Sequence, residues 1–342
     1  MPSKKPWTPK NAGHALFAAR VLLNAKMGGA MAESYFRQAA ALDKQLASPA
    51  VKEAVAELAI ADFNASKPDW AWPRLGKAQY EDALRKLDAA IKVSAKKADL
   101  HFIGDKSEHF IFYTDSDLKT AQFWANKLEA AYARLCRTFD LDPRQNVWQG
   151  KCAVILCRSH DSYLKWMGAV APGNGMAAKS GGLSISNAAF PGSNSIQFYH
   201  NPNDVPQTES VLYHELSHAF TAQFHGNHNL CSWANEGLAE YIATNGKGIE
   251  PKIQASNEAV KRAGTMEDFY AADNINFKHY GAAFQITGLL LRKNPKGYAV
   301  FVKACTEGVE PEEALKANCG LTIDQLTAGY GRMLAFPRLR SH

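Results

Sequence analysis

The chain has 342 residues, of which 46% are hydrophobic and 21% are charged. This length suits one large domain or two modest domains, and the apolar content is ample for a buried core. No uninterrupted apolar run approaches the roughly 18 residues that a membrane-spanning helix needs. We therefore expect a soluble globular protein without a membrane span.

The formal net charge of +6 is concentrated in the N-terminal third. Residues 1–106 hold 17 of the 39 basic and 11 of the 33 acidic residues, so the rest of the chain has 22 of each. The N-terminal Lys and Arg residues are interleaved with Asp and Glu at helical spacing, as on an ordinary solvated helix face. A nucleic-acid partner is therefore not expected, although a basic surface is the feature that such proteins use.

The cysteines and the N-terminus bear on the cellular compartment. The six cysteines include no C-x-x-C pair and mostly resemble buried small hydrophobic residues, while Cys305 and Cys319 would pair only in an oxidising compartment. Lys4 and an apolar stretch at 15–23 resemble a signal peptide, but Arg20 interrupts that stretch. The cytoplasm is favoured slightly over export, and no compartment is assigned.

The apolar spacing predicts a helical N-terminal domain followed by a domain that mixes strands and helices. Helices over 12–47, 49–65 and 78–97 form the first domain, residues 1–100, with an aromatic, proline-containing loop at 66–73. Residues 101–342 form the second domain. Its predicted strands cover 109–113, 152–157, 183–186 and 195–200, and its predicted helices cover 117–138, 207–224, 281–293, 296–305, 311–317 and 322–335.

The predicted helix 207–224 carries the sequence His214-Glu215-x-x-His218. Two histidines four residues apart share one helical face, so both imidazoles can reach a single zinc ion. Glu215 follows the first histidine and is placed to take a proton from the attacking water. If both histidines only filled the core, Glu215 would be buried without a partner at a cost of several kcal/mol.

A second motif follows after a loop. A helix capped by Ser232 and closed by Asn245-Gly246 carries Glu236 and Glu240 on one face. The pattern H-E-x-x-H followed by N-E-G-x-A-E resembles the gluzincin metallopeptidases, which include thermolysin-like and aminopeptidase-N-like enzymes.

The resemblance implies an α+β catalytic domain with a small mixed sheet, an active-site helix and a helical C-terminal lobe. It implies one zinc ion per chain, held by His214, His218 and Glu236, with Glu215 as the general base. It also implies that Glu240 orients His214 through the other ring nitrogen. Glu240 as the zinc ligand in place of Glu236 is the alternative.

The segment 280–290 resembles the helix that follows the transition-state tyrosine in aminopeptidase-N-like and related peptidase-MA-like proteins. This likeness implies that Tyr280 donates a hydrogen bond to the oxyanion of the tetrahedral intermediate. The adjacent His279 is the alternative donor.

Two related patterns are not matched. Aminopeptidase-N-like enzymes carry a G-A-M-E-N segment, but the nearest stretch here, residues 175–178, has no glutamate, so aminopeptidase specificity is not expected. The closer likeness is to peptidase-MA-like families of bacterial proteins. Metzincins need glycine and histidine where this chain has Thr221 and Phe224, and we expect the nearby His225 and His228 to have no metal role.

The expected function is hydrolysis of peptide bonds in a peptide or protein substrate. Strand 195–200 is ordinarily a core or an edge strand; because an edge strand near the site binds extended substrate in gluzincins, Ile196 to Tyr199 are the candidate here. The alternative function is a non-hydrolytic, zinc-containing module that binds a partner through its N-terminal helices. The pattern does not assign substrate sequence, endo- or exo-action, or oligomeric state.

Overall fold

The computed structural model describes residues 75–342 with gaps at 145, 149, 174, 176, 187–193 and 224–229, and only scattered residues before 75. The chain divides into two compact units, Met1–Ala83 and Leu84–His342. The predicted helices 12–47 and 49–65 and the loop 66–73 lie largely outside the described residues. The domain boundary at residue 100 therefore stays a prediction.

The second unit contains a small mixed sheet, as expected for an α+β fold. Its strands are β1 (Ile103–Lys106), β2 (Phe110–Thr114), β3 (Cys152–Cys157), β4 (Gly182–Ser186) and β5 (Asn194–Tyr199). They lie in the order β1-β2-β3-β5-β4. The three central strands are parallel to one another, and each edge strand is antiparallel to its neighbour.

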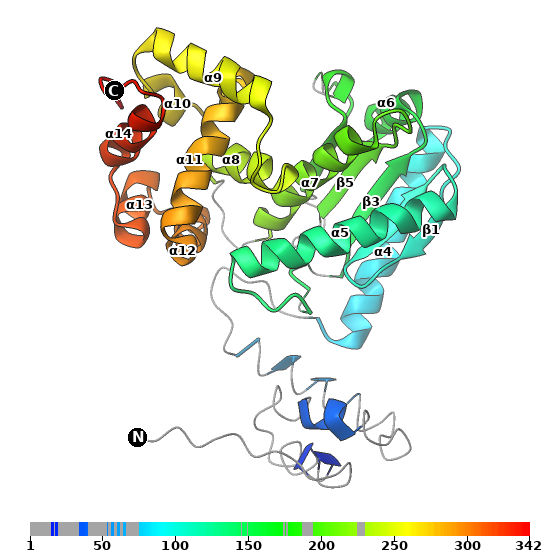
Figure 1. The fold of residues 1–342 in the computed structure, drawn as a ribbon. Helices are drawn as coiled ribbons and strands as arrows, with labels where there is room; N and C mark the ends of the chain where they lie inside the picture. The colour runs from blue at the N-terminus through cyan, green and yellow to red at the C-terminus, as the bar shows by residue number, and fades with distance from the viewer. Residues whose placement is uncertain are drawn as a thin grey trace. The chain divides into compact units, whose positions relative to one another are not determined.

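Helices cover both faces of the sheet. Helix α4 (Lys77–Lys97) and helix α6 (His160–Val170) contribute to the apolar core on one face. Helices α5 (Leu118–Thr138) and α7 (Val205–Thr221) pack on the other (Figure 1). All six residues of β3 are buried, which explains its uninterrupted apolar sequence.

Of the two alternatives for strand 195–200, the edge position is wrong and the interior position is correct. This strand, β5, pairs with β3 on one side and with β4 on the other. The edge strand that packs against α7 is β4. The alternating pattern of a strand does not reveal which segments pair with it. The residues of β5 alone therefore could not show its position in the sheet.

The C-terminal part of this unit is helical, as predicted. Its elements are α8 (Ser232–Ala243), α9 (Glu250–Ala263), α10 (Glu267–Ala271), the short 3₁₀ helix η3 (Phe277–His279), α11 (Tyr280–Lys293), α12 (Pro295–Thr306), α13 (Pro311–Cys319) and α14 (Ile323–Met333). Helix α8 contacts both α7 and α11, and thus joins the sheet layer to the helical lobe (Figure 1).

Two further features concern cysteines and membranes. All six cysteines are free thiols, and all but Cys231 are buried. Among the described residues, no helix has the length and hydrophobicity to cross a bilayer.

Helices α8 and α11 approach each other closely at Gly237. A Cβ atom on Gly237 would lie 2.5 Å from the carbonyl oxygen of Ala283 and would also collide with Oγ1 of Thr287. Since one of these atoms belongs to a helix backbone, a side chain cannot be accommodated by a rotamer change. The residue that follows Glu236 is therefore a glycine for packing reasons.

We expect Gly237→Ala to lower the free energy of unfolding by about 2 kcal/mol or more, because overpacking of this kind costs roughly 1–3 kcal/mol. Gly168→Ala in α6 is the matched control, because a Cβ atom there meets no atom within 4 Å. Alanine at that helical position should stabilise by up to about 1 kcal/mol. Urea unfolding of both variants checks the difference, and equal stabilities would contradict the packing assignment.

Candidate metal centre

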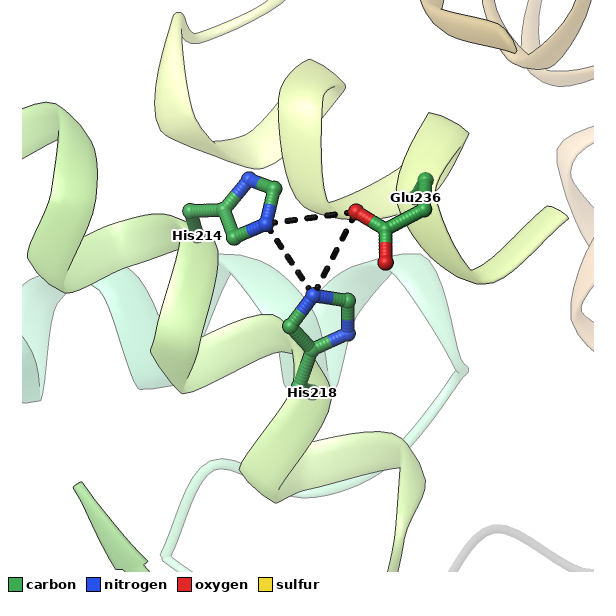
Figure 2. A group of neighbouring side chains, drawn as sticks. All are labelled: His214, His218 and Glu236. Atoms are coloured by element: carbon green, nitrogen blue, oxygen red, sulfur yellow. Dashed lines mark hydrogen bonds and ion pairs between the residues drawn. The ribbon is translucent and has the colours of Figure 1, made fainter. Parts of the chain in front are cut away.

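Helix α7 presents His214 and His218 toward α8. Asp204 caps the helix by accepting a hydrogen bond from the backbone N–H of Gln207 at 3.0 Å. Leu212 and Leu216 are fully buried. The two histidines are partly exposed and lie on the face that meets α8 (Figure 2).

Helix α8 begins at Ser232, so its N-cap lies one residue before the predicted position. The prediction that Ser232 is the N-cap is wrong, because Cys231 occupies that position and makes no side-chain capping bond. The Ser232 hydroxyl instead accepts a hydrogen bond from the backbone N–H of Ile275 at 2.9 Å. The helix closes as expected, with positive φ angles at Asn245 and Gly246.

His214, His218 and Glu236 converge, and their ligand atoms all lie within 4.8 Å of one another (Figure 2). The two Nε2 atoms are 3.1 Å apart. Oε2 of Glu236 lies 3.4 Å from Nε2 of His214 and 3.6 Å from Nε2 of His218. Tetrahedral zinc ligands at normal bond lengths are about 3.4 Å apart. The observed spacing fits a zinc ion bound by these three side chains.

The Glu236 carboxylate supports the same fit. Its Oε2 atom is fully buried and accepts no hydrogen bond from any described residue. A buried carboxylate oxygen without a donor is costly unless a cation compensates it. A metal ion between this oxygen and the two imidazoles would supply that compensation.

The remaining nitrogen of each imidazole faces an oxygen acceptor. Nδ1 of His214 lies 3.3 Å from Oε1 of Glu240, and Nδ1 of His218 lies 3.1 Å from Oδ1 of Asn235. Such partners fix the ring orientation and place the proton on Nδ1, which leaves Nε2 free for a metal. Asn235 was not singled out from the sequence, although it directly precedes Glu236 in the motif.

The position of Glu240 favours Glu236 as the metal ligand. Glu240 lies beside the Nδ1 side of His214, and both of its oxygens accept hydrogen bonds from Lys252. It is therefore placed to orient His214, as the resemblance implies.

The carboxylates give the centre a negative potential. Burial lowers the pKa of His214, but the adjacent Glu236 and Glu240 outweigh this effect and raise the pKa above its ordinary value. Burial likewise raises the pKa of Glu236, but its contacts with His214 and His218 lower the pKa well below its usual range. The centre therefore favours positive charge, which a bound cation would provide.

Glu215 is buried on α7 immediately after His214, with 8% of its surface exposed. It makes no hydrogen bond with another described residue. A buried carboxylate without a fixed donor is available to exchange a proton with a bound water.

Tyr280 lies at the centre, whereas His279 does not. The rings of Tyr280 and His214 are nearly parallel, with centroids 6.2 Å apart. Burial and then the Glu236 carboxylate raise the pKa of Tyr280, so its phenol stays protonated at neutral pH and can donate a hydrogen bond. His279 packs edge-to-face against Phe269 instead.

No second centre of this kind occurs within the part of the chain that the structure describes. His225 and His228, which we expect to have no metal role, lie outside the described residues.

No model of a protein family matches this chain, and no curated protein matches its sequence. The likeness to gluzincins therefore stays a prediction from the motif residues.

We expect zinc to bind once per chain and to stabilise the folded protein. Zinc at one hundred times its Kd should raise the free energy of unfolding by about 2.7 kcal/mol. Glu236→Ala should lose this gain, whereas Glu258→Ala on the exposed face of α9 should keep it. Metal content by mass spectrometry and urea unfolding with and without zinc test this. Equal zinc content in both variants would exclude Glu236 as a ligand.

Proposed function

We propose that this protein is a zinc-dependent peptidase. One observation carries the proposal: His214, His218 and Glu236 gather their ligand atoms within 4.8 Å of one another, and the buried Glu215 is the next residue after His214 on α7. Three protein ligands with an adjacent carboxylate are typical of catalytic zinc sites, whereas structural sites usually have four protein ligands.

His214, His218 and Glu236 would hold the metal. A bound zinc ion supplies a Lewis acid that polarises the scissile carbonyl and makes a water molecule more acidic. Glu215 removes a proton from the attacking water and later delivers it to the leaving amine.

Tyr280 and Glu240, which both lie next to His214, support these steps. The Tyr280 phenol donates a hydrogen bond to the oxygen that gains negative charge as the carbonyl is attacked. The Glu240 carboxylate holds the proton of His214 on Nδ1 and keeps the ring oriented toward the centre.

The substrate would be an extended peptide chain. Strand β4 lies at the sheet edge and packs against the helix that carries the two histidines. An edge strand offers unpaired backbone groups to which a peptide can add as a further strand. This strand takes the place that the resemblance assigned to residues 195–200.

Glu215→Gln should abolish cleavage of an unbiased peptide library while keeping the zinc content of the wild type. General-base catalysis is typically worth about 10²- to 10⁴-fold in rate, and the amide cannot accept the proton. Mass spectrometry of the cleavage products and of the bound metal tests both parts. Zinc binding without cleavage by the wild type would instead favour a zinc-containing module that binds a partner.

Tyr280→Phe should lower kcat by about 10²- to 10³-fold, as does removal of other oxyanion donors, with little change in KM. His279→Ala is the control, because the His279 ring packs against Phe269 and its loss should leave kcat close to the wild-type value. Steady-state kinetics on a peptide taken from the library measures both. A larger loss in the His279 variant would assign the oxyanion donor to His279.

A further inference from the structure

We infer that Lys252 is a positioning residue of the metal centre, which acts on His214 through Glu240. This inference rests on the proposed function, because it concerns the same centre. Lys252 lies on α9, outside both sequence motifs.

The contacts form a continuous chain from α9 to the metal ligand. The Nζ atom of Lys252 donates to both carboxylate oxygens of Glu240, at 2.9 and 2.8 Å. Glu240 is buried, and its Oε1 lies 3.3 Å from Nδ1 of His214. A carboxylate held at both oxygens cannot turn away from the imidazole, so Lys252 fixes the acceptor that orients His214.

Lys252 also lies beside the tyrosine at the centre. Its Nζ atom is 5.8 Å from the centroid of the Tyr280 ring and 5.2 Å from that of Phe277. A cation over two aromatic faces is attracted to both. One ammonium group thus joins α9 to the carboxylate on α8, to Phe277 of η3 and to Tyr280 at the start of α11.

The backbone around Lys252 is held in place by a close helix contact. A Cβ atom on Gly281 would lie 2.5 Å from the carbonyl oxygen of Lys252, so glycine permits the approach of α9 to α11. The Ser256 hydroxyl accepts a hydrogen bond from the N–H of Gly281 at 2.9 Å and donates to the carbonyl of Lys278 at 2.6 Å. The position of Lys252 is therefore fixed relative to Tyr280.

Positioning and simple electrostatics predict opposite effects when Lys252 is removed. The positive charge of Lys252 repels a nearby cation, so loss of that charge alone would tighten zinc binding. Loss of positioning would release Glu240 from His214 and weaken zinc binding. The direction of the change therefore distinguishes the two roles.

The test measures the zinc Kd of the full chain by competition with a chromogenic chelator, for wild type, Lys252→Met and Lys252→Arg. Lys252→Met should weaken binding about 10-fold or more, since partners outside the ligand set are typically worth about 10- to 100-fold. Lys252→Arg keeps the charge and the two-point contact and should restore most of the affinity. Lys261→Met on the exposed end of the same helix is the control and should bind like the wild type.

A double-variant comparison separates positioning from a general loss of folding. In the Glu240→Gln background, Lys252→Met should change the Kd by less than about threefold, because interacting residues are not additive when one acts through the other. Tighter binding in Lys252→Met, or an equal loss in both backgrounds, would overturn the inference. Absence of zinc binding by the wild type would instead refute the proposed function itself.

Discussion

The candidate centre depends on the close packing of α8 between α7 and α11. Three consecutive residues of α8 meet three different requirements. Asn235 contacts the Nδ1 of His218, Glu236 brings an oxygen between the two imidazoles, and Gly237 lets α11 approach. Because helical residues are separated by about 100°, adjacent positions point in different directions. The N-E-G sequence thus joins the candidate metal ligands on two helices to the helix that carries Tyr280.

This packing gathers carboxylates in a poorly solvated place, and their charges need compensation. The charge of Glu240 is compensated by Lys252, which donates hydrogen bonds to both carboxylate oxygens. The buried Oε2 of Glu236 has no hydrogen-bond donor among the described residues and lies beside the two imidazoles. An uncompensated buried charge is expensive, whereas a metal ion between ligands removes that cost. The two carboxylates, one helical turn apart, therefore have different partners and are suited to different roles.

The sequence predicted the local elements well and the long-range contacts poorly. The pattern of His214 and His218 on one helix and Glu236 on the next depends on helical spacing, which is a local property. The role of Lys252 could not be seen, because its contact with Glu240 depends on how α9 packs against α11. The choice between an edge and an interior position for strand β5 stayed open for the same reason, since its pairing with β4 depends on distant residues. Serine is a residue type that often caps helices, but tertiary packing directs the Ser232 hydroxyl to the backbone N–H of Ile275.

The division of labour between Glu236 and Glu240 also bears on whether the centre is catalytic. Glu240, one helical turn from Glu236, lies beside Nδ1 of His214 and is held there by Lys252. A purely structural zinc site would gain from a fourth protein ligand, whereas a catalytic site needs that position for water. In the proposed zinc site, Lys252 would hold Glu240 away from the metal and leave the fourth position to water. Such an arrangement would stabilise an open site at the expense of a tighter one, as the proposed hydrolysis requires and a purely structural role does not.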